Sequence, residues 1–215
     1  MKKVIFFGAG DFACEAFPHA AVNADICGFI SEDNIFNEIL CSRFEKKYKK
    51  KFTNHLHNSI ETTNLKSDFD NYFLAVFSPK VKKRVSSIID KYITPISLFH
   101  PSSIIDDHSI ICSGVFMDAF STVSHGSKIG SHTFVGRSSN LGHNNIIDSF
   151  CSIGPGVQIT RNIKIGEGST IGANSTILPN VSIAKNVTIA PNSLVSRSIT
   201  EENSTWIGSI IKRIR

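Results

Sequence analysis

Residues 141–195 read LGHNNIIDSFCSIGPGVQITRNIKIGEGSTIGANSTILPNVSIAKNVTIAPNSLV, and they are the last part of a repeat that begins at Ile105. Every sixth residue from Ile105 to Val195, sixteen positions in all, is aliphatic or Met. Four places later lies a second position that is mostly small or β-branched, such as Ser109 and Val115. A six-residue period fits neither an amphipathic helix nor an alternating strand. It is typical of a parallel β-helix, in which each hexad forms one flat side of a coil and its aliphatic residue points into a narrow core.

Two columns of residues at the corners of this β-helix follow from the repeat. A triangular coil takes three hexads, so residues eighteen apart lie above one another on coils about 4.8 Å apart. Side chains leave the coil near its corners, so we expect the polar chemistry of the chain in these columns. One column contains Asp107, His125, His143 and Arg161, and the other contains Ala119, Arg137, Pro155, Ala173 and Pro191.

Length and composition indicate a chain of two modest domains, because 215 residues suffice for a sizeable core. No transmembrane run is present, and the apolar stretch Val4 to Phe7 ends too early for a signal peptide. We therefore expect a cytoplasmic protein without membrane insertion. The five cysteines are odd in number, scattered and never spaced as Cys-x-x-Cys, which argues against a disulfide framework or a zinc ribbon.

The net charge of +5 comes largely from two basic runs, Arg43 to Lys51 and Lys80 to Arg84. Such runs can bind nucleic acid or an anionic membrane. A solvated helix or loop face is the simpler interpretation, so we expect no nucleic-acid partner.

Residues 1–98 have the pattern of a βαβ domain. A buried strand at Lys2 to Phe7 leads into a Gly-x-Gly-x-x-Ala turn that begins at Gly8, and a helix follows. This fingerprint is typical of a helix N-terminus that faces an anion. A second strand, Asp25 to Ile30, ends beside Glu32 and Asp33, which suit either a ribose hydroxyl or a solvated turn.

The rest of this region completes half of a dinucleotide-binding domain. We expect a strand at Tyr72 to Phe77, a helix from Ser78 to Tyr92 and a short last strand at Ile96 to Phe99. Half a domain suits a single nucleotide better than NAD. The predicted organisation is an α/β half-Rossmann domain at 1–98, the parallel β-helix at 99–198 and a C-terminal tail at 199–215.

His143 is the candidate general base of the first corner column. A neutral imidazole can take a proton from an amine or a hydroxyl group as it attacks an acyl carbon. His143 lies in the middle of the repeat, and Arg161, one coil further on, offers a main-chain N–H to an oxyanion. Ice-binding and purely structural solenoids share this architecture, so the fold alone does not indicate catalysis.

These features follow one another in the same order as in a known family of enzymes. A βαβ half-domain, the junction His100-Pro101-Ser102, unbroken hexads and a histidine followed by a polar residue in the middle of them occur together. Over essentially its whole length the chain resembles the bacterial sugar acetyltransferases of the sialic acid O-acetyltransferase and bacillosamine-pathway N-acetyltransferase family. The resemblance implies a left-handed β-helix, a homotrimer with acetyl-CoA between adjacent β-helices, and a nucleotide-linked sugar on the N-terminal half-domain.

The resemblance also implies roles for individual residues. His143 matches the catalytic base, with Asn144 beside it, and the main-chain amide of Arg161 matches the oxyanion donor. Acetyl-CoA is expected to contact Ala173, Pro191 and Lys212. The implied substrate-binding residues are Gly8, Gly10, Asp11, Phe12, Glu32, Asp33, Ser78 and His125.

The chain departs from the family at several of these positions. Family members usually have an acidic residue directly after the catalytic histidine, whereas Asn144 orients a ring without stabilising an imidazolium by charge. His125 and Asp118 are the candidates to replace that acid. Asp11-Phe12 stands where members often have Gly-His, Phe77-Ser78 replaces a Gly-polar pair, and Gly208 to Lys212 only partly keeps the Gly-x-Pro-Ala-Lys tail that borders the CoA site.

The predicted function is acetyl-CoA-dependent N-acetylation of a nucleotide-linked amino-deoxy sugar for a bacterial surface glycan, without a metal. O-acetylation of a sugar or sialic acid and an inert sugar-nucleotide-binding protein are the alternatives. A trimeric β-helix carbonic anhydrase would need three histidines on zinc. His108, His125, His132 and His143 are available, but Asp148 occupies the position of that family's closing histidine.

Overall fold

The computed structural model describes residues 3–8, 12–14, 16–18, 25–31, 53–56, 69–209 and 212–214, and only the main chain of residues 31, 53–56 and 212–214. The chain divides into two compact units. One comprises Met1–Phe77 and Val81–Leu98, and the other comprises Ser78–Lys80 and Phe99–Arg215. Each unit has a hydrophobic core of its own.

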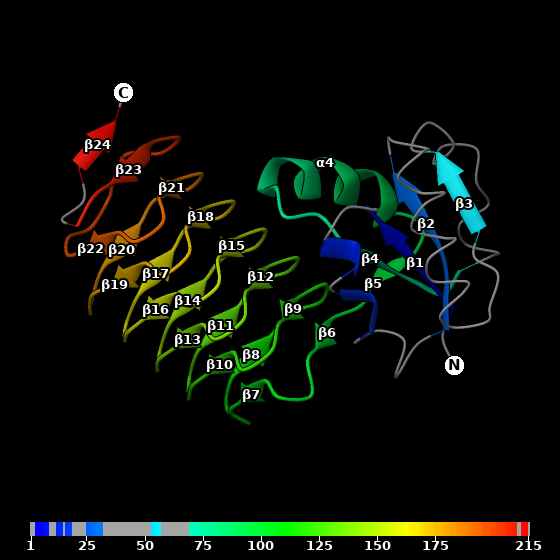
Figure 1. Cartoon of the computed structure of the whole chain (residues 1–215), viewed down its shortest axis with the longest axis horizontal. Helices are drawn as coiled ribbons and strands as arrows, with labels where there is room; N and C mark the ends of the chain where they lie inside the picture. The colour runs from blue at the N-terminus through cyan, green and yellow to red at the C-terminus, as the bar shows by residue number, and fades with distance from the viewer. Residues whose placement is uncertain are drawn as a thin grey trace. The chain divides into compact units, whose positions relative to one another are not determined.

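The first unit contains a parallel five-stranded sheet in the order β3-β2-β1-β4-β5 (Figure 1). Its strands are β1 (Lys3–Phe7), β2 (Asp25–Ser31), β3 (Thr53–Leu56), β4 (Asn71–Leu74) and β5 (Thr94–Pro95). Residues 12–14 and 16–18 are helical, and α4 spans Pro79–Ile89. Within the described ranges, no helix has the length and apolar character needed to cross a membrane.

Aromatic side chains dominate the core of this unit. The ring of Phe6 lies 6.2 Å from that of Phe17, 5.9 Å from that of Phe29 and 5.3 Å from that of Phe73, measured between centroids. Aromatic residues bury large areas, so a few of them can supply most of a small core. Tyr72 is also buried, and its hydroxyl group donates a hydrogen bond to Asp90. Burial raises the pKa of Tyr72, and the Asp90 carboxylate adds to this effect.

Gly8, directly after β1, occupies a position that only glycine tolerates. Its φ angle is +109°, and a Cβ atom there would lie 2.4 Å from the carbonyl oxygen of Ala75. Its N–H donates to the carbonyl of Ile30 over 2.7 Å. The fold of the sheet therefore requires glycine at position 8, whether or not this residue also contacts a ligand.

The second unit is a β-helix of three sheets, whose strands have two residues each, apart from the last two strands of the third sheet, and run parallel, apart from the last one (Figure 1). One sheet contains β7 (Ile104–Ile105), β10 (Thr122–Val123), β13 (Asn140–Leu141), β16 (Gln158–Ile159), β19 (Thr176–Ile177) and β22 (Leu194–Val195). The second contains β8 (Ile110–Ile111), β11 (Lys128–Ile129), β14 (Ile146–Ile147), β17 (Lys164–Ile165) and β20 (Ser182–Ile183). The third contains β6 (Leu98–Phe99), β9 (Phe116–Met117), β12 (Phe134–Val135), β15 (Ser152–Ile153), β18 (Thr170–Ile171), β21 (Thr188–Ile189), β23 (Thr205–Ile207) and β24 (Lys212–Ile214).

The strand register confirms the predicted eighteen-residue coil. Leu141 pairs with Val123 on one side and with Ile159 on the other, so the aliphatic residues of successive coils stack directly. From Met117 to Val195 every aliphatic residue of the repeat is buried, whereas Ile105 and Ile111 in the first coil are only partly buried. The hexad period thus produces one continuous core.

The second repeat position connects neighbouring coils by buried hydrogen bonds. The Ser139 hydroxyl group donates to the carbonyl oxygen of Gly154 over 2.8 Å and accepts the N–H of Val157 over 3.2 Å. Buried polar groups are costly unless they are hydrogen-bonded, and these are bonded in both directions. The same pair of bonds recurs at Ser127, Ser169 and Ser175.

The segment after Val195 adds two strands to the third sheet. β23 pairs in parallel with β21, and Thr205 lies opposite Thr188, seventeen residues away instead of eighteen. β24 then pairs antiparallel with β23. The residues predicted as a tail therefore extend the sheet in a different register.

Candidate active site

The corners of the β-helix have a backbone requirement that decides many of their residues. In the corner that contains His143, the second turn residue is Asn144, Asn162 or Asn180, with φ angles of 57°, 54° and 65°. Asparagine adopts this left-handed conformation more readily than most residues. The left-handed turn is therefore a structural reason for asparagine at position 144, where family members usually have an acidic residue.

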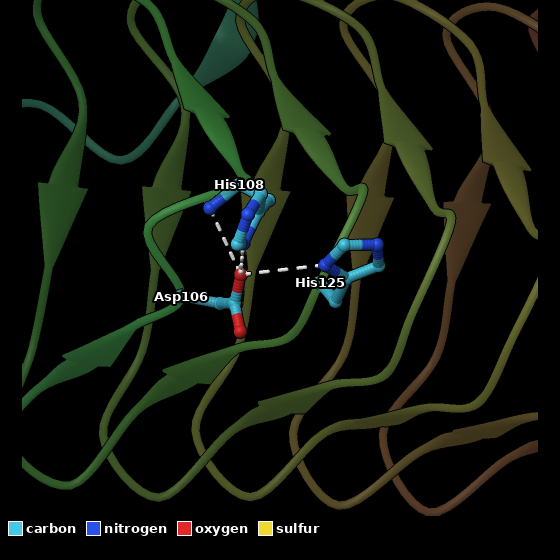
Figure 2. A group of neighbouring side chains, drawn as sticks. All are labelled: Asp106, His108 and His125. Carbon is cyan, nitrogen blue, oxygen red and sulfur yellow. Dashed lines mark hydrogen bonds and ion pairs between the residues drawn. The ribbon is translucent and has the colours of Figure 1, made fainter.

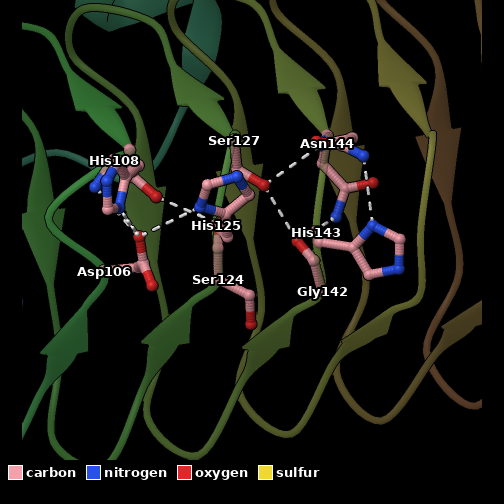
Figure 3. Close-up of polar contacts among 10 residues, drawn as sticks. Asp106, His108, Ser124, His125, Ser127, Gly142, His143 and Asn144 are labelled. Atoms are coloured by element: carbon pink, nitrogen blue, oxygen red, sulfur yellow. Dashed lines mark hydrogen bonds and ion pairs between the residues drawn. The ribbon is translucent and has the colours of Figure 1, made fainter.

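His143 is exposed at the corner between β13 and β14. The side-chain amide of Asn144 lies 3.2 Å from His143 Nδ1, and the imidazole projects away from the coil (Figure 3). An amide can donate through its nitrogen or accept through its oxygen. The amide atom that faces Nδ1 is the nitrogen Nδ2, so Nδ1 accepts a hydrogen bond and Nε2 carries the proton of the neutral ring. Turning the amide over places its oxygen against Nδ1 and leaves Nε2 a lone pair for a substrate.

Arg161 lies one coil beyond His143 and is exposed. The next residue, Asn162, donates its N–H to the carbonyl oxygen of His143 over 3.2 Å. Within the described part of the chain, the N–H of Arg161 itself donates to no carbonyl oxygen. This N–H is therefore available to a ligand, as an oxyanion donor requires.

The two candidates for the missing acid have other partners. Asp118 is buried, lies 3.4 Å from Nε of Arg137 and accepts the N–H of Ala119 over 2.7 Å. His125 Nδ1 lies 3.7 Å from Asp106 Oδ1. Among the contacts of the described residues, the side-chain partner of His143 is Asn144.

The second corner column is packed on glycines. A Cβ atom on Gly154 would lie 2.8 Å from the nitrogen of Ala173, and one on Gly172 would lie 2.4 Å from the nitrogen of Pro191. Ala173 is half-buried and Pro191 is exposed, so these two positions present small, uncharged groups to solvent. Lys212, the third predicted CoA contact, lies in β24, and its side chain is outside the described residues.

The predicted sugar-binding residues of the first unit are only partly described. Phe12 is half-buried, and its ring packs edge-to-face on Phe73 with centroids 6.2 Å apart. Ser78 is half-buried and directly precedes α4. Four predicted residues lie outside the described residues, namely Gly10, Asp11, Glu32 and Asp33, and so does the basic run from Arg43 to Lys51.

The structure also groups Asp106, His108 and His125, which the sequence analysis did not combine (Figure 2). The eighteen-residue rule placed Asp107 in the column of His125, but Asp106 supplies the contact. An Asp-Asp-His turn one coil before a histidine was the available indication. The pKa of Asp106 is lowered, mainly by a hydrogen bond from the main-chain N–H of His108.

The four histidines proposed for a carbonic anhydrase, whose zinc is bound across a subunit interface, do not all lie together within one chain. The rings of His108 and His125 lie 4.9 Å apart. His132 instead is buried and stacks on Phe150, with centroids 5.2 Å apart and ring planes 15° apart. The described metal-ligand geometry therefore involves two histidines and one aspartate.

Comparison with known proteins finds a family match in the last part of the repeat. Residues 162–197 match the family described as bacterial transferase hexapeptide (six repeats). The chain is 30% identical over 128 residues to the GDP-perosamine N-acetyltransferase of Escherichia coli O157:H7, an alignment that covers 58% of this chain and 54% of that relative. The matched region thus spans about half of the relative's length.

Solved structures share the fold over the whole chain. PerB of Caulobacter crescentus, in complex with CoA and GDP-perosamine, matches with a TM-score of 0.86 at 15% identity, over 100% of this chain and 98% of that chain. The acetyltransferase domain of PglB from Neisseria gonorrhoeae FA1090, in complex with acetyl coenzyme A, matches with a TM-score of 0.81 at 18% identity, over 99% of each chain. The resemblance to sugar acetyltransferases that the sequence predicted is confirmed.

Proposed function

We propose that this chain is an acetyl-CoA-dependent N-acetyltransferase that acts on the amino group of a nucleotide-linked amino-deoxy sugar. The observation that carries the proposal is the exposed imidazole of His143, held at Nδ1 by Asn144 in the middle of the β-helix. The fold is shared with proteins solved with CoA and GDP-perosamine, and a curated relative is a GDP-perosamine N-acetyltransferase.

The reaction is direct acyl transfer. With the Asn144 amide turned so that its oxygen accepts the Nδ1 proton, the sugar amine attacks the thioester carbonyl carbon and His143 Nε2 takes the proton that the amine loses. Negative charge develops on the carbonyl oxygen, toward which Arg161 donates its N–H. The carbon–sulfur bond then breaks, and His143 passes the proton it took from the amine to the sulfur, so that CoA leaves as the thiol. The step needs neither a covalent enzyme intermediate nor a metal.

The rest of the proposal concerns binding and assembly. The CoA arm runs along the small residues of the second corner column, Ala173 and Pro191, with Lys212 at its border. The sugar nucleotide binds to a half-Rossmann domain, whose parallel β3-β2-β1-β4-β5 sheet supports this role. We further propose a left-handed β-helix, a homotrimer, a place in surface glycan biosynthesis and a cytoplasmic location.

The test is release of free thiol from acetyl-CoA with a panel of nucleotide-linked 3-amino and 4-amino sugars that includes GDP-perosamine. His143→Ala should lower turnover by roughly 100-fold or more, because general base catalysis contributes about that much. The oligomer, measured by size-exclusion chromatography with light scattering, should stay intact. Lys164→Ala, which changes an exposed residue of β17, is the matched control and should leave turnover unchanged.

Other outcomes would select an alternative. Release of thiol with free sialic acid and with no amino sugar would indicate an O-acetyltransferase. Binding of acetyl-CoA without turnover of any acceptor would favour an inert sugar-nucleotide-binding protein. Loss of the oligomer together with activity in His143→Ala would mean that His143 is a packing residue.

A further inference from the structure

The first coils of the β-helix bring one carboxylate and two imidazoles close together. Asp106 Oδ1 lies 3.3 Å from His108 Nδ1 and 3.7 Å from His125 Nδ1 (Figure 2). One ligand atom from each of the three residues lies within 4.8 Å of the others. His108 and His125 come from turns on successive coils, so this convergence is a product of the stacking.

Hydrogen bonds fix the backbone that carries these three side chains. Asp106 donates its N–H to the carbonyl oxygen of Val123 and accepts the N–H of Ser109, each over 2.9 Å. The Ser109 hydroxyl group donates to the carbonyl oxygen of Ser124 over 3.0 Å, next to His125. Both turns are therefore fixed by hydrogen bonds within and between coils, as Figure 3 shows around the labelled residues. Fixed backbone positions of this kind favour a preorganised ligand site.

The spacing and the chemistry of the three groups fit zinc. Zinc binds imidazole nitrogen and carboxylate oxygen at about 2.0–2.2 Å in a tetrahedron, so its ligand atoms lie roughly 3.3–3.5 Å apart. The separations of 3.3 and 3.7 Å are close to that value. Calcium and magnesium prefer oxygen ligands, and two imidazoles disfavour both.

We propose that Asp106, His108 and His125 form a zinc-binding site with further coordination positions open to water. The side chains of His108 and His125 are 73% and 65% exposed, so their rings can rotate to close on an ion. The zinc links the first two coils, where Ile105 and Ile111 are only partly buried. Acetyl transfer by His143 needs no metal, so this site is separate from the proposed reaction.

The experiment titrates the chelator-stripped full-length protein with Zn²⁺ in competition with a chromophoric chelator. One zinc per chain is expected to compete, and its binding should raise the melting temperature of the β-helix. His108→Ala and Asp106→Asn should each weaken binding by at least about 100-fold, because even loss of an outer-shell partner of a metal ligand costs 10–100-fold. Ca²⁺, titrated in the same way, should neither bind nor stabilise.

His143→Ala is the matched control, since it removes an exposed histidine from the same corner column. It should bind zinc as tightly as the natural chain while losing acetyl transfer, whereas His108→Ala should lose zinc and keep acetyl transfer. Unchanged zinc affinity in both His108→Ala and Asp106→Asn would overturn the site, as would a Co²⁺-substituted protein whose absorption spectrum shows thiolate ligands. Each variant is expected to lose one property and keep the other. Failure of the zinc site is therefore distinguishable from failure of the proposed acetyl transfer.

Discussion

The two units of this chain build their cores in different ways. In the β-helix, each aliphatic residue stacks on a residue of the same kind one coil away, and each buried hydroxyl group repeats the bonds of the last. In the N-terminal unit, a few large rings around Phe6 make contacts that occur once. The stability of a repeat protein is approximately a sum over neighbouring repeats, so the β-helix distributes its stability while the N-terminal unit concentrates it.

The distribution of chromophores allows the two units to be followed separately. The chain has three tyrosines, Tyr48, Tyr72 and Tyr92, and all of them precede the β-helix. Its single tryptophan is Trp206, in β23 of the β-helix unit. Tryptophan fluorescence therefore reports on one unit, and tyrosine signals report on the other.

The largest effect on stability is expected from Phe6→Ala. Removal of a buried phenylalanine costs about 3–5 kcal/mol, and Phe6 contacts three other rings. Urea unfolding followed by tyrosine near-ultraviolet circular dichroism should shift strongly, while the Trp206 fluorescence transition stays in place. An equal shift of both transitions would show that the two units unfold as one. It would contradict the expectation that each unit depends on a core of its own.

A smaller effect is expected from Ser139→Ala in the β-helix. The change leaves the carbonyl oxygen of Gly154 and the N–H of Val157 without the hydroxyl group that connects them, which costs about 1–3 kcal/mol. The Trp206 transition in urea should move by that amount. Thr122→Ala, whose hydroxyl group bonds an exposed Asn140, is the control and should change stability by less than about 0.5 kcal/mol. An equal loss of stability in the two variants would show that the buried hydroxyl groups stabilise the β-helix no more than exposed ones do.

Alkaline pH should act on the N-terminal unit through Tyr72. Burial and Asp90 raise the pKa of Tyr72 above its unfolded value of about 10. This contribution to stability is therefore fully present below pH ~10 and is lost as the pH rises further, because the unfolded state loses its proton first. The tyrosine-detected stability of the natural chain should fall above pH ~10, and Tyr72→Phe should lack this part of the fall. Identical pH profiles for both proteins would contradict the prediction.

The smallest effect is expected from Asn144→Asp. This variant tests whether Asn144 is needed for the left-handed turn or for its contact with His143. Aspartate also tolerates the left-handed conformation at φ 57°, so stability should change little. A carboxylate beside His143 favours the protonated ring, and the acid limb of the rate–pH profile should move to higher pH, with a change in turnover below about fivefold, as for an exposed ion pair. Asn162→Asp, at φ 54° in the same column, is the control and should leave the profile unchanged. A loss of fold in either variant would mean that the corner requires asparagine itself.

The sequence predicted the β-helix well because its determinants are local. One aliphatic residue per hexad, repeated sixteen times from Ile105 to Val195, fixed both the core and the eighteen-residue stacking of the coils. The strand β23 was not predicted, because its register differs from that of the repeat by one residue. The aromatic cluster around Phe6 has no period, so the sequence could not show which rings meet.

The candidate site shows the same division. Sequence alone selected His143, Asn144 and Arg161, since residues at one corner of successive coils must lie above one another. Only the tertiary structure showed that Asn144 also satisfies a left-handed turn, that Asp118 pairs with Arg137, and that Asp106 joins His108 and His125. A repeat determines where each Cα atom lies, but the partner of a side chain depends on rotamers and hydrogen bonds between coils, which no sequence spacing encodes.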